Sequence, residues 1–347
     1  MAYATFNKPS LHFNTKTYSG NGGTQAITGL GFQPDMVWIK KRNGTTNHHL
    51  VDVARGVGYY IYPNLSNAQG GNGSTLITAF GTDGWTMDSG ADSNASGATG
   101  VGWAWKAGNS AGSSNTDGSI NTTTTSVNSS AGFSISTYTG NGSSPATIGH
   151  GLGVAPTTVW IKRLSNADGM IVYHESYGNN ASVKMDRDGT SEGNFLNSVS
   201  PTSTVVSVTN STECNTNGQA YVMYCFAEKK GYSKFHKYIG NGSSDGNFCY
   251  TGFKPAFVMV KNITATAIWM LYDNKRDTEN PNTKALMPNE NYAEDANAEN
   301  IDFLSNGFKC RGTGVKLNNS GQTFLYWAFA SLPTVINVGQ SFPATAE

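Results

Sequence analysis

The densest group of potential metal ligands in the sequence is formed by His48, His49 and Asp52. A zinc site needs three or four nitrogen, sulfur or oxygen ligands that converge on one point. The position of Asp52 recurs in two later segments as His174 and Asp273, and neither has a His-His pair before it. We therefore interpret the three residues as a polar loop, and predict no metal and no cofactor.

A second recurring position lies three residues further along the chain and holds Arg55, Tyr177 or Arg276. One interpretation is a repeated binding groove. The other, which we favour, is a local polar pair with the preceding Asp or His that fixes a loop. The sequence offers a small set of candidate binding residues on this basis: His48, His49, Arg55, Tyr177, Arg276 and Trp85.

Motifs of the common enzyme classes are missing from the sequence. It contains no G-x-S-x-G, no H-E-x-x-H, no Walker loop and no strand–G-x-G-x-x-G–helix unit. The two carboxylates of a glycosidase remain an open alternative, because their separation in space cannot be read from sequence. We predict a protein that is not an enzyme.

Three copies of one long motif organise the chain. Each copy has a Y-x-G-N-G segment and then P-x-x-V-x-x-K, whose prolines are Pro34, Pro156 and Pro255. Similar offsets in all three copies predict homologous units rather than shared composition. The predicted divisions are an arm (1–12), repeat 1 (13–108), a Gly/Ser/Thr/Asn linker (109–132), repeat 2 (133–231), repeat 3 (232–333) and a tail (334–347).

The local patterns within each repeat are those of strands. The run after each proline is rich in β-branched residues, which favours a buried strand. The closing run of repeat 1 places Trp103 and Trp105 two residues apart, so that both side chains face one side of a strand. We interpret these aromatic residues as core residues and predict an all-β chain of three tandem antiparallel β-sandwich domains.

Composition excludes several classes of protein. Only 13% of the 347 residues are charged and the formal net charge is zero, so no basic surface for nucleic acid is expected. The four cysteines form no C-x-x-C pair, and we interpret Cys225 as a small buried apolar residue. The first residues do not resemble a secretory signal, and no apolar run is long enough to span a membrane.

Two segments outside the repeats are expected to depend on neighbours for order. The linker between repeats 1 and 2 has the composition of a flexible chain. The arm carries Tyr3 and Phe6, and Pro9 disfavours a helix. We predict that the arm lies extended against another subunit or a particle surface, anchored by Tyr3 and Phe6.

The repeat motifs resemble those of a known protein family. The segments that carry the resemblance are FNTKTYSGNGGTQAITGLGFQPDMVWIKKRN, YVMYCFAEKKGYSKF and YTGFKPAFVMVK. They are similar to tandem-repeat virion proteins encoded by phages of marine bacteria, including cyanophages, over residues 13–331. The resemblance implies a place on a virus particle, reached without a signal peptide, and it supplies no catalytic residues.

The resulting prediction is a structural protein on the exterior of a phage particle, either a capsid decoration or a part of the tail. Its expected partners are other virion proteins and further copies of itself. The alternative is an adhesin or tail-fibre protein that binds a glycan or receptor on the host surface through β-sandwich loops. Its motivating residues are His48, His49, Arg55 and the aromatic side chains Tyr59, Tyr60 and Trp85.

Overall fold

A computed structural model of the chain describes residues 6, 8–71, 76–89, 92–295 and 299–331. Its elements are antiparallel strands, apart from the short 3-10 turns η1 (Pro9–Leu11) and η2 (Asp92–Asn94). Strands pair into several sheets, and large and small sheets pack face to face within each repeat. The prediction of an all-β fold of sandwich type is confirmed.

Repeat 1 shows the basic sandwich. Its strands are β1 (Phe13–Ser19), β2 (Gln25–Thr28), β3 (Met36–Lys41), β4 (His49–Asp52), β5 (Ile77–Gly81), β6 (Gly84–Met87) and β7 (Thr99–Trp105). The large sheet has the order β1-β7-β3-β4 and the small sheet the order β2-β6-β5. The predicted strand after Pro34 is β3, and the predicted closing strand is β7.

Repeat 3 has the same plan. Its strands are β16 (Ser233–Ile239), β17 (Phe248–Tyr250), β18 (Phe257–Asn262), β19 (Met270–Asp273), β20 (Ile301–Leu304), β21 (Gly307–Cys310) and β22 (Thr323–Phe329). The large sheet has the order β16-β22-β18-β19 and the small sheet the order β17-β21-β20. The outer strands β19, β20 and β16 each form an isolated bridge beyond their sheet, at Leu271, Ile301 and Ser233.

Repeat 2 departs from this plan at both sheets. Its strands are β8 (Thr122–Asn128), β9 (Phe133–Thr139), β10 (Ala146–Gly149), β11 (Thr158–Arg163), β12 (Ile171–His174), β13 (Val183–Lys184), β14 (Val205–Val208) and β15 (Ala220–Phe226). The large sheet is extended to β13-β12-β11-β15-β9-β8, whereas the small sheet is reduced to β10-β14. Repeat 2 has no counterpart of the small-sheet hairpins β5–β6 and β20–β21. Its sequence also lacks the turn of those hairpins, an Asp-Gly or Asn-Gly pair followed by an aromatic residue.

Part of the predicted linker at residues 109–132 is a strand in the large sheet of repeat 2. Residues 122–128 form β8, which pairs along β9 in an antiparallel register. Thr, Ser and Val are good strand residues once an edge strand offers them backbone partners. The neighbour that orders this segment is repeat 2 of the same chain, so no larger assembly is needed to explain its order.

Each large sheet is buried on both faces. Successive side chains point to opposite sides of a strand, so alternate residues enter different cores. On β3, Val37 and Ile39 enter the core of repeat 1, whereas Met36 and Trp38 enter a second core that all three repeats share. We call the second cluster the shared core. Its aromatic members come from all three repeats and include Trp38, Trp103, Trp105, Trp160, Tyr224, Phe226, Phe257, Trp327 and Phe329.

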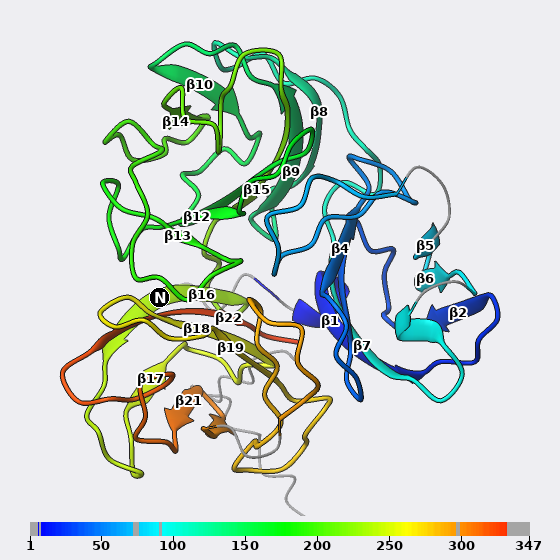
Figure 1. Cartoon of the computed structure of the whole chain (residues 1–347), viewed down its shortest axis with the longest axis vertical. Coiled ribbons are helices and arrows are strands. Elements are labelled where there is room, and N and C mark those ends of the chain that lie inside the picture. Colours follow the sequence, from blue (N-terminus) through cyan, green and yellow to red (C-terminus); the bar gives the residue numbers. More distant parts are fainter. Residues whose placement is uncertain (1–5, 7, 72–75, 90–91, 296–298, 332–347) are drawn as a thin grey trace, which may run out of the picture.

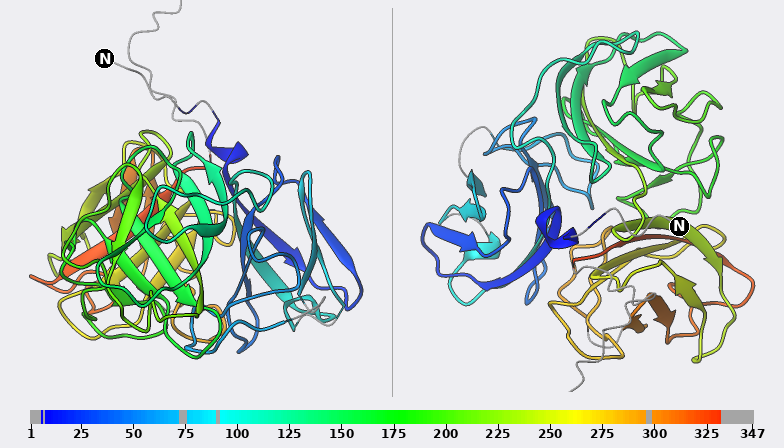
Figure 2. Two further views of the ribbon diagram at one scale, coloured as in Figure 1. Left: turned by 90° about the horizontal axis from the view of Figure 1, so that it is seen from above. Right: turned by 180° about the vertical axis from the view of Figure 1, so that it is seen from behind.

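The shared core explains the shape of the molecule. Figure 1 shows three lobes around a common centre, and the view from behind in Figure 2 shows the same arrangement. Trp103 and Trp105 point to one side of β7, as the sequence predicts, and that side faces the centre. Each repeat has a core of its own. The aromatic faces of the large sheets, however, are shielded from solvent only where the three repeats pack together.

The Y-x-G-N-G turn has the same geometry in each repeat. Its last glycine has a positive φ of 73°, 70° and 68° at Gly22, Gly142 and Gly242. Such angles favour glycine, which confirms the tight turn predicted from the Asn-Gly pair. The turn ends β1, β9 and β16 and leads the chain from each large sheet to the small sheet of the same repeat.

Candidate functional site

The recurring Asp or His position joins one repeat to the next. The Asp52 carboxylate accepts a hydrogen bond from the Tyr224 hydroxyl of repeat 2 at 2.6 Å. The Asp273 carboxylate accepts one from the Trp103 indole nitrogen of repeat 1 at 2.9 Å. These aromatic donors occupy equivalent places on the closing strands β15 and β7.

The third contact completes the ring around the centre. Trp327 of repeat 3, at the same place on β22, packs edge-on against His174 with ring centroids 4.8 Å apart. Its indole nitrogen donates to the Thr158 hydroxyl of repeat 2 at 3.1 Å. Repeat 1 therefore accepts from repeat 2, repeat 2 from repeat 3, and repeat 3 from repeat 1.

The arginines at the second recurring position hold the carboxylates of this ring. Arg55 pairs with Asp52 at 2.6 Å, and Arg276 pairs with Asp273 at 2.5 Å. Arg276 also pairs with Glu294 at 3.0 Å, and its guanidinium lies over the Trp103 ring. The local polar pair favoured from the sequence is thus present in repeats 1 and 3. Its partners are inside the protein.

Tyr177 holds the same position in repeat 2 and acts differently. Its hydroxyl donates to the Thr190 carbonyl at 3.0 Å, and its ring packs against the shared core. His174 accepts a hydrogen bond from the Ser176 backbone N–H through Nδ1. Burial lowers the pKa of His174 to about 3, so the ring is neutral at ordinary pH.

The two neighbouring histidines of repeat 1 do not converge. Buried His48 accepts from the Trp38 indole at 2.9 Å and contacts the Met287 carbonyl of repeat 3 at 3.1 Å. His49 is half-buried against the rings of Tyr60 and Tyr62, and burial lowers its pKa to about 4. Among the described residues, no three His, Cys, Asp or Glu side chains are grouped to hold a metal ion.

Two further candidates are also used inside the chain. Trp85 is 1% exposed and lies in the core of repeat 1, so it has no face for a ligand. Phe6 was expected to anchor the arm to another subunit. Instead it stacks on Tyr232 of the same chain with ring centroids 4.4 Å apart and is buried in the shared core. Tyr3 lies outside the described residues.

Sequence reasoning missed three buried lysines, two of which bridge one repeat to another. The Lys162 ammonium donates to the Leu65 carbonyl of repeat 1 at 2.9 Å, and Lys261 donates to the Asp188 carbonyl of repeat 2 at 2.9 Å. Lys40, at the same place in repeat 1, donates to the carbonyls of Lys41 and Gly44. Burial lowers each pKa to about 8. The available signal was the lysine six residues after each motif proline.

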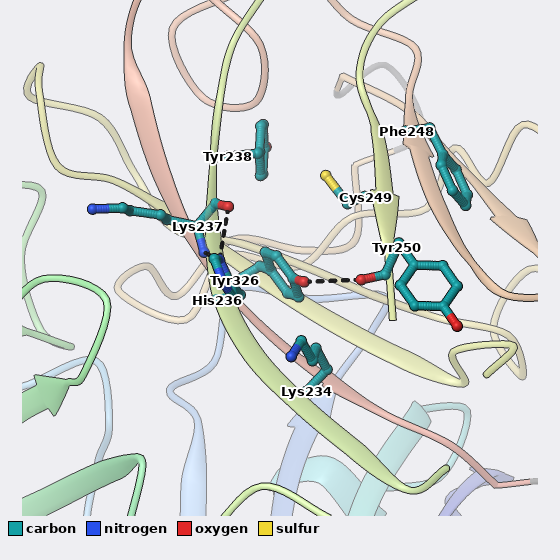
Figure 3. A pocket seen from close by; sticks show the side chains of 8 residues that line it. All are labelled: Lys234, His236, Lys237, Tyr238, Phe248, Cys249, Tyr250 and Tyr326. Carbon is teal, nitrogen blue, oxygen red and sulfur yellow. Dashed lines mark hydrogen bonds between the residues drawn. The ribbon is translucent and has the colours of Figure 1, made fainter. Parts of the chain in front are cut away.

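An open groove lies at the edge of repeat 3. It has a volume of about 310 Å³ between β16 of the large sheet and β17 of the small sheet. Figure 3 shows Lys234 and His236 on one wall, Cys249 and the backbone of Tyr250 on the other, and Tyr326 between them. The Tyr326 hydroxyl donates to the Tyr250 carbonyl at 3.4 Å and closes the floor. No sequence motif marks this groove.

Side chains cover the unpaired backbone of β16 only in part. The Phe235 N–H donates to the Glu228 carboxylate at 3.3 Å, and Glu228 also pairs with Lys234 at 2.7 Å. The Lys237 N–H donates to Nδ1 of its neighbour His236 at 2.8 Å. Charged side chains beside an edge strand discourage pairing with other chains. The stretch of β16 from His236 onward has the weaker cover.

Comparison with known proteins identifies a family whose function is unknown. Among the described residues, no helix is long and apolar enough to cross a membrane. No curated protein and no solved structure matches the chain. Residues 8–333 match the model of a domain of unknown function, DUF7483, as one unit that contains all three repeats. The chain therefore belongs to the DUF7483 family.

Proposed function

We propose that the chain is a non-enzymatic structural protein on the exterior of a phage particle, where its three repeats form one knob. The observation that carries the proposal is the use of the recurring polar positions. Asp52, His174 and Asp273 receive contacts from neighbouring repeats, and Arg55 and Arg276 hold the two carboxylates. Residues at these recurring positions thus stabilise the packing of the three repeats against one another and do not face a substrate.

The virion itself is proposed from the resemblance of the repeat motifs to phage proteins, and several properties are compatible with it. The chain has no net charge, and its four cysteines are free and buried, so it does not depend on disulfides. Capsid decoration and tail attachment both remain within the proposal.

The adhesin alternative has lost most of the residues that motivated it. His48 and Trp85 are buried, Arg55 is paired with Asp52, and His49 packs against tyrosine rings. Without a group of exposed polar and aromatic side chains at these loops, we do not propose glycan binding there.

The test is the protein content of purified particles. Quantitative mass spectrometry of gradient-purified phage is expected to find this chain at a fixed ratio to the major capsid protein, and antibody labelling of intact particles is expected to place it outside. A chain that is abundant in infected cells but absent from purified particles would contradict the proposal.

A further inference from the structure

The groove of repeat 3 has a counterpart in repeat 2 that the chain itself fills. There, the Ile120 N–H donates to the Thr147 carbonyl of β10 at 2.9 Å, while Thr125 pairs with Ser136 of β9. Ile120 also forms a parallel bridge with Ile148, and its side chain is 5% exposed in the core of repeat 2. One extended segment thus joins the edges of both sheets and places an aliphatic side chain between them.

The two places correspond strand by strand. β9 and β16 each pair with the closing strand of their repeat, with Tyr138 opposite Tyr221 and Tyr238 opposite Phe324. In the small sheets, β10 pairs with β14 and β17 pairs with β21; β10 turns Ala146 and Ile148 into the core of its repeat, and β17 turns Cys249 into its own. The groove between β16 and β17 is therefore the space that residues 120–125 occupy in repeat 2.

Repeat 1 fills most of the same space with its own side chains. Lys16, which like His236 lies two residues before the motif tyrosine, reaches Gly29 so closely that a Cβ there would lie 2.8 Å from its ammonium. The remaining hollow is about 140 Å³ and lies among polar residues such as Asn14 and Lys275. Repeat 3 has the larger and less polar opening.

The surroundings of the groove indicate the chemistry of its occupant. Glu228 balances the Lys234 charge, and the Lys237 ammonium, although its residue lines the groove, points away from the opposite wall (Figure 3). Two apolar side chains of residues that line it are exposed: Phe248 by 45% and Tyr250 by 63%. Exposed apolar side chains gathered beside an unpaired strand edge are typical of a surface that binds another chain.

We propose that this groove binds an extended, uncharged, Ser/Thr-rich segment of another protein, with one aliphatic side chain inserted as Ile120 is in repeat 2. The segment would take backbone hydrogen bonds from the edge of β16, where the Lys237 N–H donates to the ring of the adjacent His236. Main-chain pairing supplies affinity in such strand addition, and the inserted side chain supplies specificity. That the partner is a virion protein rests on the proposed function. The site itself does not.

The direct test uses the segment that fills repeat 2 as the probe. A synthetic peptide of residues 118–128, GSINTTTTSVN, is added to the full chain, in which the counterpart in repeat 2 is already occupied. Hydrogen-exchange mass spectrometry is expected to show slower exchange at residues 234–239 and 248–250 and no change at residues 13–19. The same peptide with Ile120→Asp is expected not to bind, because a carboxylate would be buried without a partner.

A matched pair of variants locates the backbone contact. Lys237→Pro removes an N–H that faces away from β22, which an edge strand tolerates. It is expected to weaken peptide binding about tenfold, the factor that corresponds to one lost hydrogen bond of ordinary strength. Thr17→Pro makes the same change at the equivalent place on β1 and is expected to leave binding unchanged. Thermal unfolding of both variants shows whether each remains folded.

The proposal is overturned if millimolar peptide leaves exchange at both strands unchanged, a result that needs no variant. It is also overturned if Thr17→Pro weakens binding as much as Lys237→Pro, or if a host glycan, rather than the peptide, protects residues 234–239. Each of these results leaves the virion proposal standing. Conversely, a chain absent from particles that still binds the peptide would refute the virion proposal alone.

Discussion

In repeat 2, β8 pairs with the outer edge of β9, whereas in repeat 3 no strand of the described residues pairs with the outer edge of β16, which has an isolated bridge at Ser233 and is covered by Glu228, Lys234 and His236. The difference follows from the length of the segment that precedes the first strand of each repeat. Twenty-four residues of linker precede repeat 2, but repeat 3 follows β15 almost directly. Glu228 stands five residues before β16, as Asn128, the last residue of β8, stands five before β9.

The same two repeats also differ at the ring of contacts around the centre. Repeat 3 presents the charged pair Asp273–Arg276, and repeat 2 presents the neutral pair His174 and Tyr177. Charged pairs buried in a protein are costly to break because the remaining partner stays charged. The comparison teaches that similar positions support one architecture by different physical means, and each means has its own sensitivity to mutation and pH.

The largest effect is expected at the buried charged pair. Asp273→Ala leaves the fully buried Arg276 with only Glu294 as an acidic partner and removes the acceptor of the Trp103 indole. Breaking such a pair costs about 3–5 kcal/mol of unfolding free energy. His174→Ala at the same position removes neutral contacts and is expected to cost about 1–3 kcal/mol. Urea unfolding measures both, and equal costs would contradict the distinction between the two repeats.

A smaller effect is expected where the linker closes repeat 2. Ile120→Ala removes an aliphatic side chain that is buried between the two sheets. Because the site is near the surface and can relax, we expect a loss of roughly 2–3 kcal/mol, in the lower part of the usual range. Ile239→Ala in the exposed edge of repeat 3 serves as the matched control and should change stability by less than about 0.5 kcal/mol. Thermal or urea unfolding distinguishes them.

The neutral contact of repeat 2 is expected to make stability depend on acid. Burial lowers the pKa of His174 from 6.5 to about 3, so the folded state binds fewer protons than the unfolded state between these values. Its contribution is complete above about pH 6.5 and is lost as the pH falls toward 3, by up to about 1.4 kcal/mol per pH unit.

The variant His174→Asn isolates this contribution. An asparagine oxygen can replace Nδ1 as acceptor for the Ser176 N–H, but it does not titrate. The unfolding free energy of the wild-type chain should therefore fall more steeply with acid than that of the variant. Parallel curves from pH 7 to pH 4 would show that His174 is not the group responsible.

The smallest effect is expected at the cover of β16. Glu228→Ala removes a partly exposed ion pair with Lys234 and the acceptor of the Phe235 N–H. Exposed ion pairs contribute about 0–1 kcal/mol, so global stability should hardly change. The amide of Phe235 is nevertheless expected to exchange faster, which hydrogen exchange detects. A loss of several kcal/mol would mean that this edge is part of the stable core and not a lightly covered one.

Local structure within the repeats follows from the residue pattern alone. The β-branched run after each motif proline became a central strand, the Asn-Gly pair became a turn with positive φ, and the alternating aromatic residues of the closing strand were buried on one side. These features depend on near neighbours and on the two-residue period of a strand, which are written in the sequence. The pairing of Asp52 with Arg55 is local in the same sense.

What those features face depends on how the three repeats pack against one another. A strand period shows that Trp103 and Trp105 share a side, but not that this side meets two other repeats. The partner of Asp273 on β7 lies 170 residues away in the chain, and the partner of the linker is an edge strand whose free backbone has no sequence signature. Composition therefore suggested a flexible linker and an arm free for other subunits. Backbone pairing with β9 instead orders residues 122–128, and Phe6 of the arm stacks on Tyr232 of the same chain.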